Sequence, residues 1–142
     1  MAVNPANRGK WAEAKVKAYL SKLNESASLA WYRFPDAHAG SLQQSLSDFL
    51  VVAKGKAYLL EVKEVAHACR LPVANYKLQQ RAKARSFELA GALALVLIYH
   101  SPIDLWRLLP NAYFGTQDKG SWDLTGQESY VSCDLALRSF NI

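Results

Sequence analysis

Hydrophobic and polar residues alternate along the chain with two different periods, and these periods predict where helices and strands lie. A helical period begins near Arg8, with Asn7 as the N-cap, and ends near Asn24. A second helix is expected from about Asn75 to Leu89, because this stretch is rich in helix formers and Gly91 follows it. The first helix has a single apolar stripe, formed by Ala12, Val16, Tyr19, Leu20 and Leu23. In the second helix the apolar positions, expected to pack inward, are Leu78, Ala82, Phe87 and Leu89.

Shorter apolar runs with β-favouring residues predict five strands. Two of these runs lie within Ser47–Lys63 and flank a Lys54-Gly55-Lys56 turn, which predicts a β-hairpin. The remaining strands are expected at 29–34, 92–99 and 104–109, the last of them at an edge of the sheet.

The order of these elements predicts the fold class. The chain reads as a helix, three antiparallel strands, a crossover helix and a further strand. A helical crossover makes the strands on either side of it parallel, so the sheet is mixed. A chain of 142 residues is long enough for one domain with a sizeable core. We therefore expect a single α/β domain, a sandwich built around a mixed sheet.

Charged residues at the hairpin point to a site. Period-2 geometry places Glu61 and Lys63 on one face of the second hairpin strand, whereas Tyr58, Leu60 and Val62 face the other way. Asp48 lies across the hairpin, opposite about residue 62, and can approach Glu61. Because this strand is apolar on both faces, it is expected to be buried, where charges need partners. Two carboxylates and a lysine at a buried sheet edge favour a divalent cation. The alternative is a simple Glu61–Lys63 salt bridge on a solvated strand.

One further acid is placed unusually. Glu13 lies one turn before Val16, on the apolar stripe of the first helix. A carboxylate in the first turn can stabilise the helix dipole. It can equally be a third acid of the hairpin site, and the residues alone leave both interpretations open.

Charge distribution favours a polyanionic partner. The net charge is +5, and basic residues gather in the first helix and in residues 54–85, on either side of the acidic site. Two such clusters favour a phosphate backbone as ligand. The basic residues that we expect to contact nucleic acid are Arg8, Lys10, Lys17, Lys77 and Arg81.

Other classes of protein are disfavoured. The longest apolar run, 92–99, is far too short to span a bilayer, so no membrane partner is expected. The two cysteines, Cys69 and Cys133, lack metal-ligand spacing, which favours a reducing cytoplasm.

Asp48, followed thirteen residues later by Glu61-Val62-Lys63, resembles the motif of the PD-(D/E)xK nuclease superfamily. The match covers about residues 8–109, with 110–142 as a C-terminal extension. Small size and an acid on the first helix make the chain most similar to archaeal and phage (endonuclease I-like) Holliday junction resolvases. Ser47 stands where the motif has proline. The resemblance implies a three-layer α/β sandwich of the restriction endonuclease-like kind.

The resemblance also implies an activity, which is Mg²⁺-dependent endonucleolytic cleavage of DNA, with Mn²⁺ as a substitute ion. Asp48, Glu61 and the backbone carbonyl of Val62 would bind the ion, Lys63 would serve catalysis, and Glu13 would be the additional acid. Gln79 or Gln80 could hold water or phosphate. The implied substrate is branched DNA, above all a four-way junction, and the implied origin is an intracellular prokaryotic or phage protein.

Two further expectations concern assembly and alternative functions. A four-way junction needs two coordinated incisions, so we expect a homodimer. Its interface could use Trp106, Tyr113, Phe114 and Trp122, unless these aromatic residues form a satellite core under the C-terminal segment. The alternatives to a resolvase are a repair or restriction-like nuclease of the same superfamily, and a non-catalytic nucleic-acid-binding module with the same fold.

Overall fold

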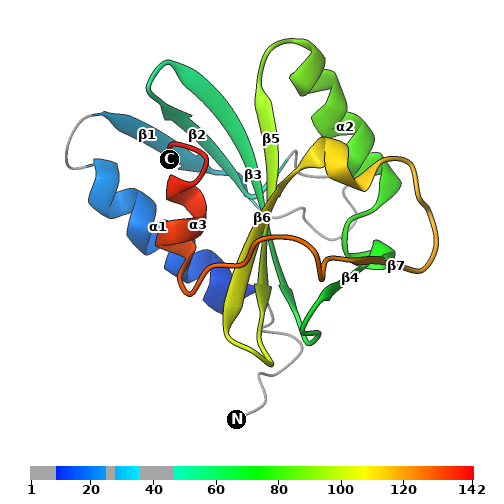
Figure 1. The fold of residues 1–142 in the computed structure, drawn as a ribbon. Helices are drawn as coiled ribbons and strands as arrows, with labels where there is room; N and C mark the ends of the chain where they lie inside the picture. The colour runs from blue at the N-terminus through cyan, green and yellow to red at the C-terminus, as the bar shows by residue number, and fades with distance from the viewer. Residues whose placement is uncertain (1–8, 25–27, 36–46) are drawn as a thin grey trace.

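A five-stranded mixed sheet lies at the centre of the computed structural model, which describes residues 9–24, 28–35 and 47–142. The strand order is β1-β2-β3-β5-β6, and only β3 and β5 run parallel to each other. The predicted mixed sheet is therefore confirmed, with β6 at the expected edge (Figure 1). The strands are β1 (Leu29–Arg33), β2 (Phe49–Ala53), β3 (Lys56–Val65), β5 (Leu93–His100) and β6 (Leu105–Pro110).

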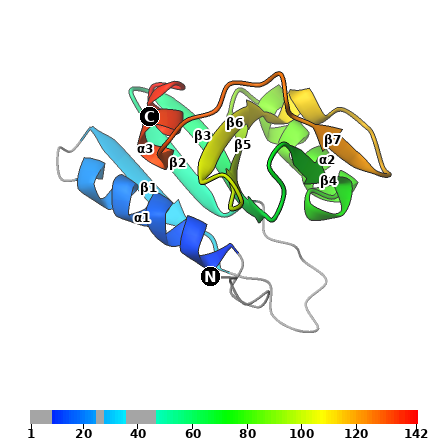
Figure 2. The ribbon, with the colours of Figure 1, turned by 60° about the horizontal axis from the view of Figure 1, so that its bottom comes forward.

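Helices cover both faces of this sheet, which confirms the predicted three-layer α/β architecture. α1 (Lys10–Asn24) and α3 (Cys133–Arg138) lie on one face, and α2 (Leu78–Leu89) lies on the other (Figures 1 and 2). A small second sheet pairs β4 (Arg70–Pro72) with β7 (Ser121–Asp123) on the α2 side. The 3₁₀ helices η2 (Val73–Asn75) and η3 (Asn111–Phe114) connect to these elements.

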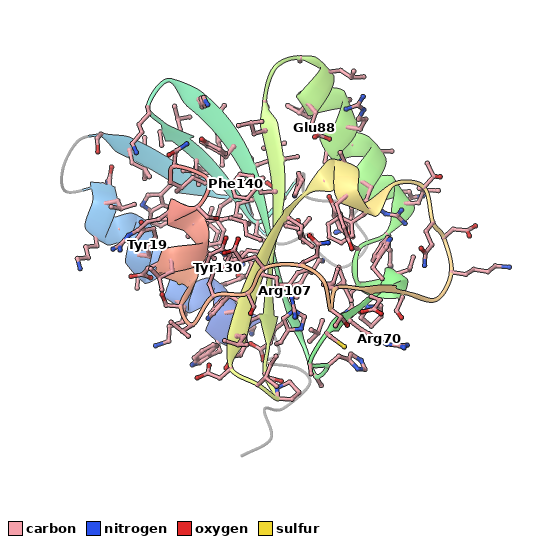
Figure 3. The ribbon with its side chains drawn as sticks, viewed as in Figure 1. Tyr19, Arg70, Glu88, Arg107, Tyr130 and Phe140 are labelled. Carbon is pink, nitrogen blue, oxygen red and sulfur yellow. The ribbon has the colours of Figure 1, made fainter. Side chains whose placement is uncertain are left out.

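The alternation of side chains along β3 divides the core into two halves. Tyr58, Leu60 and Val62 pack under α1 and α3, together with the predicted stripe residues Ala12, Val16, Tyr19 and Leu20. Figure 3 shows Tyr19 and Phe140 on this side and Glu88 on the side of α2. The hydroxyls of Tyr19 and Tyr58 donate to the carbonyls of Ile142 and Phe140, so the end of the chain closes this core. On the opposite face the core holds Val65, Leu71, Val96, Ile98, Phe114, Trp122 and Leu124.

The hairpin turn is one residue shorter than predicted. Lys54 and Gly55 alone connect β2 to β3, with φ of 52° and 79°, as a two-residue turn of the primed kind requires. Lys56 already pairs with Ala53, and Phe49 pairs with Leu60. This register places Asp48 next to Glu61, one residue earlier than expected. The correction brings the two carboxylates closer together.

The second helix differs most from its prediction. It begins at Leu78 instead of about Asn75, and β4 and η2 precede it. The apolar positions expected inside, Leu78, Ala82, Phe87 and Leu89, are all exposed. Arg81 and Ala84 are the buried residues instead. The small Ala84 side chain packs against Leu59 and Ala94 of the sheet, so large apolar residues on the other faces of α2 are left outside.

The aromatic residues considered for a dimer interface have mostly internal places. Phe114 and Trp122 are buried in the core on the α2 side, as the satellite-core alternative predicted. Trp106 is buried beneath α1, and only Tyr113 is substantially exposed. The interface interpretation is therefore wrong for three of the four residues.

Some expectations fall outside the described residues. Asn7 as N-cap and the DNA contact of Arg8 lie outside the described residues. Among the residues that the structure does describe, no helix is long and apolar enough to cross a membrane.

Candidate active site

A cavity of about 350 Å³ lies where the central sheet has an open edge. β3 continues to Val65, whereas β2 begins at Phe49, opposite Leu60. Within the described residues, no strand pairs with the last part of β3 on this side. The open edge makes both faces of β3 accessible at one place, so the cavity is lined by residues from both. They are Gly9, Glu13, Asp48, Glu61, Val62, Lys63, Glu64 and Asn75.

Backbone hydrogen bonds hold Asp48 at this edge. Its N–H donates to the Leu60 carbonyl at 3.2 Å, and its carbonyl accepts from the Phe34 N–H at 2.9 Å. Its carboxylate Oδ2 accepts the Val62 N–H at 2.7 Å. The Asp48 side chain therefore accepts a hydrogen bond from the β3 backbone at a point where β2, which begins at Phe49, offers no backbone partner. This bond fixes the carboxylate at the mouth of the cavity.

The surroundings of Asp48 disfavour its charged form. Burial, followed by the nearby Glu61 carboxylate, raises the pKa of Asp48 from 3.8 to about 8. Glu13 acts in the same direction, while the Val62 hydrogen bond and Lys63 oppose the rise. Burial and a like charge are two of the physical causes that shift carboxyl groups upward. The pair formed by Asp48 and Glu61 thus needs a proton or a cation to coexist at neutral pH.

Glu61 and Lys63 lie on the same face of β3, as their spacing predicted. Lys63 Nζ is 2.9 Å from Glu61 Oε1, and both side chains are largely buried. The Lys63 ammonium also lies 6.0 Å from the centre of the Tyr76 ring. This pair is a salt bridge, but the strand that carries it is buried rather than solvated.

Glu13 reaches the cavity from the first turn of α1. Its Oε2 accepts two hydrogen bonds from Arg33 of β1, from Nη2 at 2.8 Å and from Nε at 3.2 Å. Arg33 Nη1 also donates to the Phe34 carbonyl at 3.1 Å. The ion pair holds Glu13 toward the site, which favours its interpretation as a third acid.

Sequence reasoning missed three contributors to this site. Arg33 was not considered, although it pairs with Phe49, the neighbour of Asp48. Glu64 lies on the face of β3 opposite Glu61, and only the open edge of the sheet brings it into the cavity. Asn75 follows β4, an element that the sequence did not predict.

The residues predicted to contact nucleic acid differ in their exposure. Lys10 and Lys17 of α1 are exposed, as is Lys77 at the start of α2. Arg81 is only 3% exposed, and its guanidinium donates to backbone carbonyls of Tyr76, Gly115 and Gln117. The structure does not support its prediction as a DNA ligand, because the side chain is buried and each guanidinium nitrogen already donates to a carbonyl. Gln80 accepts the Lys77 N–H at 3.0 Å and so caps α2.

The oxygen atoms at the open edge are of the kind that a divalent cation prefers. Asp48 and Glu61 supply carboxylates. The Val62 carbonyl faces the same side as its N–H, since both groups of one strand residue point the same way. Within the described residues, no three acidic, histidine or cysteine side chains converge as a complete ligand set. An ion here would therefore need the Val62 carbonyl, water or a substrate oxygen as well.

No family model matches this chain, and no curated protein matches it. Solved structures do, and they define the fold as α/β of the restriction endonuclease-like class. One of them is the 1.6 Å structure of Archaeoglobus fulgidus Hjc, a Holliday junction resolvase from an archaeal hyperthermophile. The sequences are 21% identical and the TM-score is 0.57, over 80% of this chain and 88% of that chain. The predicted fold and its likeness to an archaeal resolvase are confirmed.

Proposed function

We propose that this protein is a Mg²⁺-dependent endonuclease that hydrolyses phosphodiester bonds in branched DNA, most of all in four-way junctions. The observation that carries the proposal is the Asp48–Glu61 pair. These two carboxylates are held together at a buried sheet edge beside Lys63, where burial and mutual repulsion disfavour their joint charge. A purely structural site gains nothing from this arrangement, whereas a metal-dependent nuclease needs it.

The residues present fit a divalent cation. Asp48, Glu61 and the Val62 carbonyl would hold Mg²⁺, or Mn²⁺ in its place, and water and a phosphate oxygen would complete the ligands. When bound, the ion would lower the pKa of a water molecule and neutralise charge on the phosphate. The raised pKa of Asp48 supports the fit, because a cation would compensate the charge that burial and Glu61 disfavour.

The protein's own side chains would divide the remaining work. Lys63, bonded to Glu61, would orient water and stabilise the negative charge of the transition state. Glu13, oriented by Arg33, would contribute the additional acid. The exposed Lys10 and Lys17 of α1 and Lys77 of α2 would bind the DNA backbone near the cavity.

Branched DNA is proposed as substrate on two grounds. The fold is similar to that of an archaeal Holliday junction resolvase. The cavity is open at the sheet edge, with the basic start of α1 beside it, so a backbone can approach it from outside. Because the described part of one chain offers one such carboxylate cavity, cutting both strands of a junction would need a homodimer with two-fold symmetry.

The alternatives remain a repair or restriction-like nuclease, and a module that binds nucleic acid without cutting it. The last is disfavoured by the buried carboxylate pair, which would destabilise an idle protein without benefit. Among the nuclease types, the likeness to the archaeal resolvase favours a resolvase.

Cleavage of a substrate panel tests the proposal. Four-way junction, flap, linear duplex and single-stranded DNA, with an RNA control, should be incubated with Mg²⁺ or with EDTA. We expect Mg²⁺-dependent cuts, mainly in the junction. Asp48→Asn and Glu61→Gln should each lower the rate at least about 100-fold while DNA binding persists. Asp118→Asn, at an exposed position, is the matched control. Undiminished cleavage by either folded variant would refute the metal site.

Light scattering tests the dimer. At micromolar concentration, with and without junction DNA, we expect two protein chains per particle, with the mass of the bound DNA added when it is present. A monomer in both conditions would contradict paired incision and favour a repair-type nuclease that nicks one strand.

A further inference from the structure

A second cavity, of about 450 Å³, lies between α1 and α3, which are side by side on one face of the sheet (Figure 1). Its α1 wall includes Trp11, Lys15 and Lys22. These three residues lie within about 40° of one another around the helix, so they form a single stripe. Among the described residues, none that lines this cavity also lines the edge cavity. Its volume is in the range of small-ligand sites, so it is a separate candidate binding site.

Trp11 is the exposed aromatic residue of this cavity. The centre of its ring lies 4.6 Å from that of Tyr99 and 6.1 Å from that of Trp106. Tyr99 and Trp106 are both buried in the core beneath α1, and aromatic rings at these distances attract each other. Trp11 itself remains 42% exposed. The two buried rings therefore hold Trp11 in place, and its exposed part is available to a ligand.

Positive charge lies along the same wall. Lys15 Nζ is 5.3 Å from the centre of the Trp11 ring, which is a cation–π distance. Lys22 follows seven residues later, about 10 Å further along the helix axis. Both lysines are exposed, and their flexible side chains can turn toward an anion. An aromatic ring beside cations is typical of sites for single-stranded nucleic acid, because a base stacks on the ring while the cations attract the backbone.

Negative charge lies on the opposite wall, at Asp104 and Asp134. Asp104 Oδ1 accepts the Tyr99 hydroxyl at 2.7 Å, which holds this carboxylate at the cavity. The two acids repel phosphate, so a nucleic-acid backbone in this cavity must lie on the α1 wall. A base that points away from its backbone then meets carboxylate oxygens, which accept hydrogen bonds from amino groups such as that of cytosine. The two walls therefore suit the two ends of one nucleotide.

We propose that the cavity between α1 and α3 binds an unpaired nucleotide of a DNA strand. Its base would stack beside Trp11, and its backbone would contact Lys15 and Lys22. The inference rests on the proposed function for the choice of DNA as ligand, and it adds a site for a base that leaves the stack where strands branch. Asp104 and Asp134 favour a base with an amino group, such as cytosine, over thymine.

Binding of short single strands in EDTA tests this site without cleavage. Fluorescence anisotropy should compare a deoxycytidine strand with an abasic strand of equal length, which has the same charges but no bases. The wild type should bind the deoxycytidine strand at least about 10-fold more tightly. Trp11→Ala should lose most of this preference, whereas Trp11→Phe should retain part of it. Tyr113→Ala, at an aromatic residue that is 38% exposed on the α2 side, is the matched control and should keep the full preference.

The ratio of the two affinities is the deciding quantity. A loss of folded protein in Trp11→Ala would weaken the binding of both strands alike and leave their ratio unchanged. Lys22→Gln should weaken the binding of both strands and lower the salt dependence, because the lysine contacts the backbone. Lys56→Gln, in the exposed hairpin, is its control and should have a smaller effect.

The two acids have a test of their own. The wild type should bind the deoxycytidine strand more tightly than a thymidine strand of the same length, because thymine has a carbonyl where cytosine has the amino group. Asp104→Asn combined with Asp134→Asn should reduce this difference. Equal binding of the two strands by the wild type would overturn the assignment of the acids to the base.

The outcomes separate this proposal from the nuclease itself. Equal affinity of the wild type for the deoxycytidine and abasic strands would overturn the nucleotide site, even if the protein cuts junctions. An unchanged preference in Trp11→Ala would overturn it as well. A preference that depends on Trp11 would support the site, even if no substrate in the panel is cut.

Discussion

The edge cavity and the surroundings of Arg81 both contain buried charge, and they differ in how completely that charge is hydrogen-bonded. The Arg81 guanidinium donates to three backbone carbonyls, at distances of 2.6 to 3.0 Å, and stacks 4.9 Å from the Trp122 ring. Asn111 bonds both the Arg81 carbonyl and Glu88. In the cavity, by contrast, Asp48 and Glu61 repel each other, and Glu64 Oε1 has no hydrogen-bond partner among the residues that the structure describes.

This difference in bonding distinguishes a region that stabilises the fold from a region that is suited to bind a ligand. A buried charge with a full set of partners ties distant segments together, and nothing more is needed from a ligand. A buried charge without partners costs stability, so the folded protein must compensate for it elsewhere. We infer that Arg81 stabilises the fold, whereas the cavity is arranged for something that binds there.

The largest expected effect on stability comes from removing Arg81 from its fully hydrogen-bonded surroundings. Arg81→Ala should lower the free energy of unfolding by about 3–5 kcal/mol, because it leaves three carbonyls without donors and removes packing on Trp122. Urea denaturation measures the change. Arg85→Ala, on the exposed side of the same helix, should change it by less than about 0.5 kcal/mol. Equal effects of the two variants would show that the Arg81 bonds contribute little.

The sequence could not reveal the role of Arg81. Its partners lie at Tyr76, Gly115 and Gln117, and the last two are more than thirty residues away. On a helix rich in basic residues, a solvated arginine is the ordinary expectation. The strand β4 was missed for the same reason, since it is three residues long and pairs with residues 121–123.

The candidate site was far more predictable, because its geometry is local. Period-2 alternation placed Glu61 and Lys63 on one face, and the hairpin brought Asp48 beside them. The apolar stripe of α1 directed Glu13 inward. Glu64 was missed because its entry into the cavity depends on where β2 begins, and Asn75 because it follows the unpredicted strand β4.

The next prediction tests whether Glu13 belongs to the functional site in the edge cavity. Glu13→Ala should lower the cleavage rate about 10- to 100-fold. It should cost less than about 1 kcal/mol of stability, since the Arg33 pair is partly exposed. A purely helix-stabilising role predicts a stability loss of about 0.3–1 kcal/mol with a normal rate. Rate and melting temperature should be measured on the same preparation, with Glu128→Ala as the control. A normal rate would remove Glu13 from the site.

His100 provides a smaller test, because its buried Nε2 also lacks a partner within the described residues. Burial lowers the pKa of His100 from 6.5, helped by the facing Arg107 of β6 and His67, against the Nδ1 contact with the His67 carbonyl. The folded state therefore binds fewer protons than the unfolded state. This contribution to stability is complete above about pH 6.5 and is lost as pH falls through the folded pKa, by at most about 1.4 kcal/mol per pH unit.

The measurement is the difference in unfolding free energy between wild type and His100→Asn, taken from pH 7.5 to 5. Asn can keep a donor near the Nδ1 position, so the variant should show a flatter profile. His67→Asn, with the exposed histidine removed, should keep most of the slope. A profile of His100→Asn parallel to that of the wild type would contradict the prediction.

The smallest expected effect lies where the two regions meet, at Tyr76. The centre of its ring lies 6.0 Å from Lys63 Nζ in the cavity. Its hydroxyl donates to Asn111 Oδ1 at 2.5 Å, within the hydrogen-bonded network around Arg81. Burial, followed by the charge of Glu61, raises the pKa of Tyr76, so the hydroxyl stays a donor. Tyr76→Phe keeps the ring but leaves Asn111 Oδ1 unpaired, which should cost about 1 kcal/mol of stability.

If the two regions are independent, Tyr76→Phe should change the cleavage rate less than about threefold. Tyr76→Leu removes the aromatic face beneath Lys63 as well, so it should lower the rate further than Tyr76→Phe does. Denaturation and cleavage rates of both variants decide the matter. A large rate loss in Tyr76→Phe, with Lys63 and its ring contact intact, would mean that the bonded network positions the cavity residues. Tyr76 would then belong to both the structural and the functional region.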